Sequence, residues 1–563
     1  MRKLKKIILL LCCIIFVLPL ILIAISFAIG YCLYVTADFR QPDIDSELCK
    51  YELSVDTDSL KICEDSFLCL NEYGLWEAYI SGNSVERGAK YGALNKDLLE
   101  YQEDVFVNQI HEIILSEWWV EFLHKVIIMF NRDMAKHIPD EYREEIYAMS
   151  LYGTDKYDSY GSSYFRQLNY HAAHDIGHMM QQYMLVGCSS FACWDDASAT
   201  GNLIVGRNFD FYVGDDFAKN KVVLFVDPDE GYRFASISWP GMMGVLSGMN
   251  EEGLTVTINA AKGAIPTTSA MPISLLARHI LQYASNIDEA YEIASQFKTF
   301  VSESLLIASA NDGYAAIIEK TPEKLALYKN QNTASDIPHQ IIVCTNHYQS
   351  DKFADDDNNK ENIATSDSPY RHERLNELLD ELSPIDADDA VSILRNRYGL
   401  GNADIGLSNE KSLNQFIAHH SVVFQPEELR FWVSTSPWQL GEYVCYELKD
   451  NGQQTTANRI GSELISADTL ALSEEYVRVC RYRNQYKELV SAMKDKRDVG
   501  SEFIEEFISN NPNYFQVYNT LGDYELSREN YRQAIIYWNK ALSLEIPRTT
   551  ERDEITSKIQ KYD

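Results

Sequence analysis

The sequence predicts a mixed α+β fold, in which a strand-rich middle region lies between two helical ones. Up to residue 186 the apolar residues mainly follow helical periodicity, whereas from Gly187 onward short β-favouring runs alternate with glycine, aspartate and asparagine turns. From about residue 474 the pattern is helical again. Runs of strands, then helices, then strands are typical of a layered α+β domain. A chain of 563 residues also exceeds what one hydrophobic core usually organises, so we expect more than one folded unit.

Changes in composition divide the chain into four regions: residues 1–36, 37–187, 188–455 and 465–563. The first is interpreted as an N-terminal transmembrane anchor or signal segment, because no residue from Ile7 to Val35 is charged and a helix of that length exceeds the ~30 Å hydrocarbon layer. Basic residues precede it and acidic residues follow it, which places the rest of the chain on the extracytoplasmic side of the membrane. A cleavable signal is the alternative, and it would leave a secreted or periplasmic protein.

Composition argues against several kinds of function. The formal net charge of −33 repels phosphate backbones, so nucleic-acid binding is not expected. The cysteines lack metal-ligand spacing, and the sequence therefore predicts neither a metal site nor a cofactor. In an exported protein the group formed by Cys49, Cys63 and Cys69 could supply a disulfide, whose pairing the sequence leaves open.

Residues 37–187 are expected to be mainly helical. The clearest helical stretches are residues 106–131, 141–151 and 171–183. His174 and His178 lie one turn apart in the last of these stretches. Because no third ligand stands at a suitable spacing, we assign both histidines to packing or to the surface rather than to a metal.

In residues 188–455 the predicted strands and helices occur in blocks. Strands are expected at residues 203–208, 221–226, 233–238, 255–259, 304–310, 314–320, 324–329, 422–425, 428–434 and 443–448, and helices at residues 274–283, 287–297 and 370–382. The acidic and polar stretch 351–367 is interpreted as a solvated loop.

The C-terminal region is predicted to contain a helical hairpin that resembles a tetratricopeptide repeat. Its spacing involves Tyr518, Leu521, Gly522, Ala534, Trp538 and Ala541, followed by Pro547. The small residues allow two helices to approach closely, while the aromatic residues fill the interface between them. One repeat is too few for an independent solenoid, so we expect the hairpin to pack on neighbouring structure and to offer a surface for a protein partner.

Five short motifs carry the chemistry, and they occur in a fixed order. They are Gly-Cys-Ser-Ser-Phe-Ala at 187–192, Gly-Arg-Asn-Phe-Asp-Phe at 206–211, Gly-Met-Asn-Glu-Glu-Gly-Leu at 248–254 leading into Ile258-Asn259, Cys-Thr-Asn-His at 344–347 and Ser-Pro-Tyr-Arg at 368–371. Together they resemble the acyl-CoA:6-aminopenicillanic acid acyltransferase family (peptidase C45-like), N-terminal nucleophile hydrolases related to choloylglycine hydrolase, over roughly residues 137–448. The resemblance implies a four-layer αββα sandwich with the nucleophile at the beginning of a strand, preceded by a helical pro-region.

The resemblance assigns the nucleophile to Cys188 and places an activating self-cleavage between Gly187 and Cys188. Once a cysteine is the first residue of a chain, its own α-amine can accept the thiol proton, because that amine has an unperturbed pKa near ~7.7–8.0. Gly187 leaves the attacked carbonyl sterically open, so the Cys188 thiol can itself attack it. A buried structural thiol, or a disulfide with Cys193, is the alternative for Cys188.

Arg207 and Asp210 are expected to flank this nucleophile. The resemblance implies that Asp210 holds the α-ammonium and that Arg207 tunes the thiolate through its fixed charge. Strand alternation places the two side chains on opposite faces, so both roles require the strand to bend or end. An exposed arginine and a turn aspartate are the alternative for this pair.

Three more residues complete the implied site. Asn259 matches the asparagine that stabilises the oxyanion, Asn346 matches a second polar donor, and Arg371 matches a charge that orients the nucleophile or the substrate. One oxyanion donor contributes ~3–4 kcal/mol to transition-state stabilisation in other enzymes. Asn259 could instead be a turn residue at the end of a strand, and Arg374 lies one helical turn from Arg371.

The resemblance implies an enzyme that hydrolyses linear amides or transfers acyl groups through a Cys188 thioester, with a small-molecule acyl amide or acyl donor as substrate. The apolar run 239–243 could line an acyl pocket, although core packing explains it equally well. Two alternatives stay open. One is a non-catalytic, membrane-anchored interaction protein that uses the C-terminal hairpin, and the other is an ester hydrolase on the same fold, similar to phospholipase B-like proteins.

Overall fold

The computed structural model describes residues 18–563 except 38, 115, 173–174, 176–185, 265–268, 331–339 and 450–458. Its strands form two sheets. The larger sheet has the order β1 (Val55–Asp56), β2 (Leu60–Cys63), β3 (Ser66–Leu70), β4 (Trp76–Gly82), β7 (Val222–Pro228), β8 (Phe234–Ser238), β9 (Ser247–Asn250), β10 (Leu254–Ala260), β11 (Glu303–Ser309), β12 (Tyr314–Lys320) and β13 (Leu325–Tyr328). The smaller sheet has the order β14 (Ile341–Cys344), β5 (Val186–Cys193), β6 (Ile204–Phe211), β15 (Ala418–Gln425), β16 (Arg430–Ser434) and β17 (Tyr443–Glu447).

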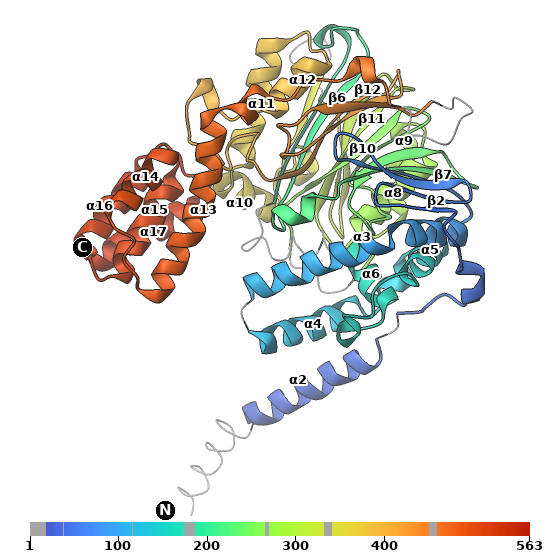
Figure 1. The fold of residues 1–563 in the computed structure, drawn as a ribbon, viewed down its shortest axis with the longest axis horizontal. Helices are drawn as coiled ribbons and strands as arrows, with labels where there is room; N and C mark the ends of the chain where they lie inside the picture. Colours follow the sequence, from blue (N-terminus) through green and yellow to red (C-terminus); the bar gives the residue numbers. More distant parts are fainter. Residues whose placement is uncertain are drawn as a thin grey trace, which may run out of the picture.

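The two sheets face each other, and helices cover their outer sides (Figure 1). Side chains from both sheets, such as Val205, Ile237 and Phe431, form one buried cluster between them. Helices α8 (Ile273–Tyr283) and α9 (Ile287–Gln296) pack on the larger sheet, and α11 (Ser368–Leu382) and α12 (Ala387–Leu394) pack on the smaller one. The layers therefore follow the order helix, sheet, sheet, helix, as expected for an α+β fold.

The prediction of a mainly helical region over 37–187 is wrong for residues 55–82. These residues form β1 to β4, and β4 pairs in parallel with β7 from Trp76 opposite Val222 to Gly82 opposite Pro228. β4 was missed because it is largely buried on both faces and so lacks the polar–apolar alternation that marks a half-exposed strand. This segment is consequently part of the larger sheet.

Four helices follow: α3 (Ser84–Ile113), α4 (Glu117–Asn131), α5 (Asp140–Ser150) and α6 (Ser163–His171). Asn83 begins α3 with a capping box, in which its side chain accepts from Glu86 N and the Glu86 side chain accepts from Asn83 N. The stretch 106–131, predicted as one helix, belongs to two, because α3 ends at Ile113 and α4 begins at Glu117. Most of the predicted helix 171–183 lies outside the described residues.

Helix α2 (Leu18–Val35) lies beside α4 (Figure 1). In the described part of the chain, none of the helices combines the length and the apolar character that crossing a membrane requires. Residues 1–17, where the predicted anchor begins, are outside that part. The membrane anchor therefore stays a prediction.

Residues 351–367, predicted to be a loop, contain the helix α10 (Asp357–Thr365). Asp356 caps this helix, because its side chain accepts from the backbone N–H groups of Asn358 and Asn359. The polar composition that suggested a loop belongs instead to an exposed helix with few buried side chains.

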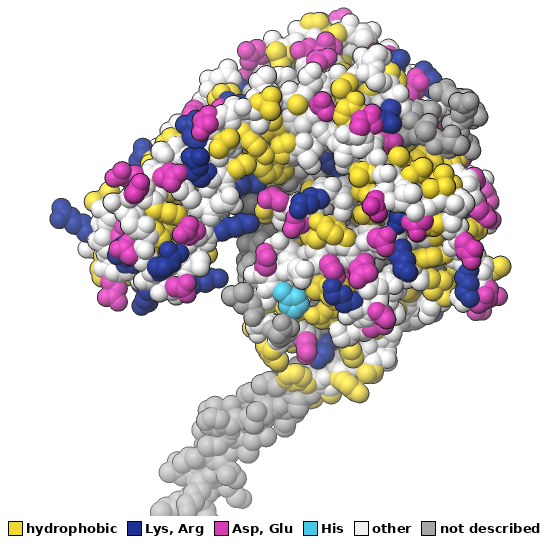
Figure 2. Space-filling model, in the orientation of Figure 1, with side chains coloured by type: hydrophobic (Ala, Val, Ile, Leu, Met, Phe, Trp, Pro, Cys, Tyr) yellow, Lys and Arg dark blue, Asp and Glu magenta, His cyan; other side chains and the backbone are white. Residues whose placement is uncertain are grey.

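The C-terminal tail consists of α13 (Glu474–Asp495), α14 (Ser501–Asn510), α15 (Phe515–Ser527), α16 (Tyr531–Leu542) and α17 (Thr549–Tyr562). Its own core includes the fully buried Trp538. The tail packs on the main body, where Leu407 N donates to Asn511 Oδ1 (3.0 Å) and Asn409 Nδ2 donates to Glu545 O (3.0 Å). Acidic and basic side chains are interspersed on its face in Figure 2. Its resemblance to a tetratricopeptide repeat stays a prediction.

Candidate active site

Gly187 and Cys188 lie near the beginning of β5, which pairs with β6 in a regular antiparallel register. Cys188 lies opposite Phe209, and Gly187 lies opposite Asp210. A β-carbon added at Gly187 would stand 3.1 Å from Gln415 Nε2, so a larger residue would crowd this position. The bond that links Gly187 to Cys188 is therefore held within a sheet rather than on a loose loop.

The Cys188 side chain points toward the larger sheet and is fully buried. Its sulfur is 3.7 Å from Arg207 NH2. Burial raises the pKa of the Cys188 thiol to about 11, although the charge of Arg207 acts in the opposite direction. The thiol is free, as is that of Cys193, so the alternative of a disulfide between them is absent from this structure. In the uncut chain Cys188 is thus a protonated and inaccessible thiol at neutral pH.

Several groups fix the Arg207 guanidinium beside the thiol. It donates to Ser247 Oγ (2.6 Å) and to the carbonyl of Ile258, and it lies 4.5 Å from the centre of the Phe209 ring. Ser247 Oγ is in turn 2.8 Å from His420 Nε2. Since Arg207 is completely buried, these contacts replace the water that an exposed guanidinium would bind.

Asn346 and Arg371 hold the backbone of Cys188 on both sides. Cys188 N donates to Asn346 Oδ1 (3.1 Å), and Arg371 NH1 donates to Cys188 O (2.7 Å). Arg371 NH2 also donates to Asn346 Oδ1 (2.8 Å). Asn346 therefore accepts a hydrogen bond from Cys188, whereas the sequence suggested a donor.

The choice between Arg371 and Arg374 is settled by their contacts. Arg374 is turned away from Cys188 and donates to Glu377, Asn396 and Asn402. Of the two, only Arg371 contacts Cys188.

Asp210 lies on the outer face of β6, together with Asn208, whose Nδ2 donates to Leu394 O (2.8 Å). The strand needs no bend, because the thiol and Arg207 share the inner face while Asp210 stands across from Gly187 on the other side. Burial raises the pKa of Asp210 to about 8, and the charges of Arg371 and Arg207 offset this only in part. Neither carboxyl oxygen has a hydrogen-bond partner in the described part of the chain.

Asn259 is buried between the two sheets, and its amide is already engaged. Its Oδ1 accepts from Ser190 Oγ (2.8 Å), and its Nδ2 donates to Cys344 O (3.0 Å). The structure therefore brings Asn259 next to β5 but does not direct its N–H groups at the Cys188 sulfur. In this state Asn259 links the two sheets.

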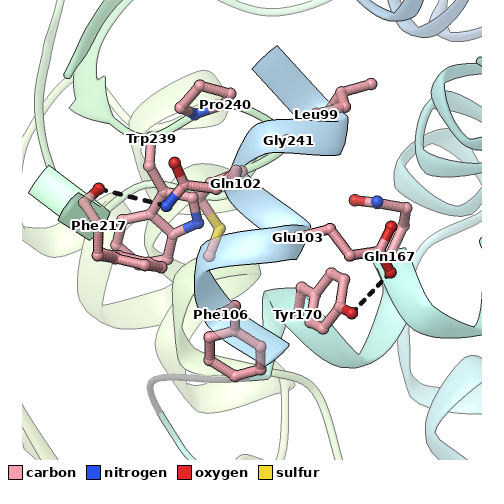
Figure 3. A pocket seen from close by; sticks show the side chains of 11 residues that line it. Leu99, Gln102, Glu103, Phe106, Gln167, Tyr170, Phe217, Trp239, Pro240 and Gly241 are labelled. Carbon is pink, nitrogen blue, oxygen red and sulfur yellow. Dashed lines mark hydrogen bonds between the residues drawn. The ribbon is translucent and has the colours of Figure 1, made fainter. Parts of the chain in front are cut away.

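Residues 239–242 of the apolar run 239–243 border a narrow crevice. Trp239 and Gly241 line it together with Phe106 of α3, Tyr170 of α6 and Phe217, which follows β6 (Figure 3). The open space is about 20 Å³, enough for roughly one water molecule. Gln102, Glu103 and Gln167 also line the crevice, and a space of this size is too small for an acyl chain, so the acyl pocket stays a prediction.

A known family model matches the middle of the chain. The family model described as acyl-coenzyme A:6-aminopenicillanic acid acyl-transferase matches residues 198–436. This segment is similar to that acyltransferase family. It contains Arg207, Asp210, Asn259, Asn346 and Arg371, and Cys188 lies just before it.

Among curated relatives, an uncharacterized protein from Archaeoglobus fulgidus is 25% identical over 402 residues, which cover 65% of each chain. The Dictyostelium discoideum protein dcd1A is 25% identical over 123 residues, which cover 20% of this chain and 28% of the relative. The chain therefore spans less than two thirds of the length of either relative.

Two solved structures were also found. The Caenorhabditis elegans ortholog of N-acylethanolamine-hydrolyzing acid amidase is 17% identical, covers 43% of this chain and 93% of its own, and has a TM-score of 0.31. A mutant of the conjugated bile acid hydrolase from Clostridium perfringens is 13% identical, covers 48% and 96%, and has a TM-score of 0.32.

Sequence reasoning did not identify Ser247 and His420, which support Arg207, or Ser189, whose hydroxyl accepts from Arg371 NH1 (3.0 Å). The only available signal for Ser189 was its place directly after Cys188. Ser247 and His420 come from β9 and β15, and their proximity depends on how the two sheets face each other. No local pattern in the sequence predicts how the two sheets pack.

Proposed function

We propose that this protein is a membrane-tethered, self-processing cysteine enzyme that hydrolyses linear amides or transfers their acyl groups. One observation supports the proposal above all: a buried carboxyl without a hydrogen-bond partner, Asp210, stands opposite Gly187 at the bond to be cut. Cleavage would create a positive α-ammonium on Cys188 within the same site. That ammonium is the kind of partner that a buried carboxylate requires.

Self-processing needs the Cys188 thiol, the Gly187 carbonyl and one water molecule. The Cys188 sulfur attacks the Gly187 carbonyl carbon, the C–N bond breaks, and the nitrogen takes up the proton that the thiol loses and leaves as the new α-amine of Cys188. Water then hydrolyses the Gly187–Cys188 thioester to release the Gly187 carboxylate and the free thiol. Arg371 and Asn346 keep the Cys188 backbone in position throughout, because they bind its carbonyl and its nitrogen.

The processed site would then act on an external amide by the same chemistry. The free α-amine accepts the thiol proton, and the thiolate attacks the substrate carbonyl while Arg207 stabilises the negative sulfur. The amine portion of the substrate leaves with a proton, and the acyl group stays on Cys188 as a thioester. Water completes hydrolysis, whereas a second amine would complete transfer.

The test is intact mass and N-terminal sequencing of the full chain beside a Cys188→Ala variant. We expect a new N-terminus at Cys188 in the unsubstituted protein and a continuous chain in the variant. A Cys193→Ala variant is the matched control, since Cys193 is a buried thiol five positions along the same strand, and it should be cut normally. An uncut chain with an intact fold would favour the non-catalytic interaction protein instead. If the cut chain hydrolyses matched esters but not amides, the ester-hydrolase alternative holds.

A further inference from the structure

Two successive histidines of β15, His419 and His420, meet on the strand next to β6. The register between these strands shifts between Ala418 and His420. In a regular strand successive side chains point to opposite faces, whereas a β-bulge re-aims one of them. At this bulge the two imidazoles approach each other, with His419 Nδ1 3.0 Å from His420 Nδ1. His420 lies opposite Phe209, and Phe209 lies opposite Cys188 on its other side. The bulge therefore brings two imidazoles close to the nucleophile.

The groups around His420 fix the direction of each hydrogen bond. Arg207 has only donors, and its NH1 lies 2.6 Å from Ser247 Oγ and 3.4 Å from His420 Nε2. Ser247 Oγ therefore accepts from Arg207, and its own proton is left for His420 Nε2, at 2.8 Å. His420 Nε2 is thus an unprotonated acceptor, so the ring carries its proton on Nδ1 and donates it to His419 Nδ1. One directed chain runs from Arg207 through Ser247 and His420 to His419.

This chain is enclosed, and its surroundings keep both histidines neutral. Arg207, Ser247, His419 and His420 are all buried. Burial lowers the pKa of both imidazoles well below the ordinary histidine value, and the charges of Lys221 and Arg207 act in the same direction. The other charged or titratable groups that act on Arg207 or Cys188 are Asp210, Glu303, Cys344 and Arg371. Near neutral pH, His420 therefore stays an acceptor for Ser247.

The NH1 side of the Arg207 guanidinium depends on this chain. NH2 donates to the carbonyl of Ile258 and lies 3.7 Å from the Cys188 sulfur, whereas NH1 donates to Ser247. The Nε atom is buried and has no hydrogen-bond partner among the described residues. Without the Ser247 contact the guanidinium could turn about its NH2 side. A positive charge within ~4–6 Å favours a thiolate, so such a turn would raise the pKa of the thiol.

We propose that Ser247 and His420 are positioning residues, which hold Arg207 against the Cys188 sulfur and thereby set the acidity of the thiol, and that His419 ends their hydrogen-bond chain. The proposal rests on the proposed function, in which the Cys188 thiolate attacks an amide. It adds residues of β9 and β15 to that site. They act through Arg207 rather than on the substrate.

The first test determines which ring nitrogens carry protons. The full-length Cys188→Ala variant, labelled with ¹⁵N in its histidine rings, is studied by NMR from about pH 5 to 8. His420 should give the signals of a neutral ring protonated on Nδ1, and His419 those of a ring protonated on Nε2. Each signal is assigned by its loss in a His420→Gln or a His419→Gln variant. A His420 ring with a proton on Nε2 could not accept from Ser247 and would overturn the proposal.

The second test measures the acidity of Cys188 in the processed enzyme. The rate of alkylation by iodoacetamide is followed against pH, by mass spectrometry of the peptide that begins with Cys188. Ser247→Ala and His420→Leu should each raise the midpoint of this profile by about one pH unit, because Arg207 is no longer held at the sulfur. His420→Gln keeps an acceptor for Ser247, so its midpoint should stay close to that of the unsubstituted enzyme.

His279→Leu is the matched control for His420→Leu. His279 is a half-buried histidine of α8 whose Nδ1 lies 2.9 Å from the hydroxyl of Tyr142, and its loss should leave the midpoint unchanged. Equal midpoints in His420→Leu and the unsubstituted enzyme, or an equal shift in His279→Leu, would overturn the proposal. If His420→Leu does not fold, Ser247→Ala decides in its place. If the chain is never cut, the proposed function fails, whereas the histidine spectra still decide whether this chain holds Arg207.

Discussion

The two oxygens of Asp210 pose an electrostatic problem in this structure. The side chain is fully buried, and no described residue forms a hydrogen bond with its carboxyl group. An ionised carboxyl in such a place is strongly disfavoured, so the group keeps its proton and its pKa is raised to about 8. If cleavage places an ammonium beside Asp210, ionising the buried carboxyl no longer carries this free-energy cost. The ionisation of Asp210 is thereby linked to processing.

The pH dependence of stability tests this account. The unfolded Asp210 carboxyl ionises near pH ~4, whereas the folded one holds its proton up to about pH 8. Unfolding therefore releases a proton between these values, and Asp210 makes the free energy of unfolding fall by about 1.4 kcal/mol per pH unit across this window. Below pH ~4 both states are protonated, and the dependence disappears. We expect Asp210→Asn, made in the Cys188→Ala background, to remove this fall in urea unfolding series from pH 4 to 8. If the free energy of unfolding falls with pH equally steeply in the Cys188→Ala protein with and without Asp210→Asn, Asp210 is not the source of this dependence.

For single residues, the sequence predicted which side chains lie in the candidate site better than it predicted their hydrogen bonds. The motifs identified Cys188, Arg207, Asn346 and Arg371, all of which meet in the structure. They did not show that Asn346 accepts from Cys188 N or that the Asn259 amide is occupied by the other sheet. Hydrogen-bond direction depends on partners far away in the sequence, and these are fixed only when the two sheets pack.

At the scale of elements, the alternation of β5 and β6 sorts the site into two faces. Cys188 and Arg207 face the larger sheet, whereas Asp210 faces the helices on the outside. The sequence predicted β6 because its apolar residues and turns are local signals. It did not predict β4, because a strand covered on both sides resembles other buried segments.

The helical hairpin of α15 and α16 gives a test at the same scale. A β-carbon at Gly522 would lie against the indole of Trp538, closer than van der Waals contact allows. Gly522→Ala must therefore separate the two helices or displace the ring, and we expect a cost of about 1–3 kcal/mol. The measurement is amide hydrogen exchange, in which α15 and α16 should lose protection by about tenfold or more.

Gly461 provides the control for that substitution. No heavy atom lies within 4 Å of a β-carbon built there, so Gly461→Ala should leave the exchange of the tail unchanged. If Gly522→Ala also leaves it unchanged, the hairpin does not depend on this close approach.

For the whole molecule, the segment before Cys188 is integrated into the fold rather than laid over it. β4 continues the larger sheet through its pairing with β7, and α5 contributes Glu145, which is fully buried. Glu145 Oε2 lies 2.6 Å from Arg278 NH1 of α8, and Arg278 also stacks on Tyr142, 4.8 Å from the ring centre. Removing the covalent link at Gly187 therefore leaves a hydrogen-bonded strand pair and a buried ion pair intact.

We expect residues 1–187 and 188–563 to remain one particle after cleavage. The two fragments should co-elute in native size-exclusion chromatography and separate only in urea. Glu145→Gln should lower the urea concentration at which they separate, because breaking a buried ion pair on one side costs about 3–5 kcal/mol. Asp216→Asn is the control, since Asp216 pairs with Lys219 on the surface, where such a pair contributes less than about 1 kcal/mol. Fragments that separate in native buffer would show instead that the sheet holds only while the chain is continuous.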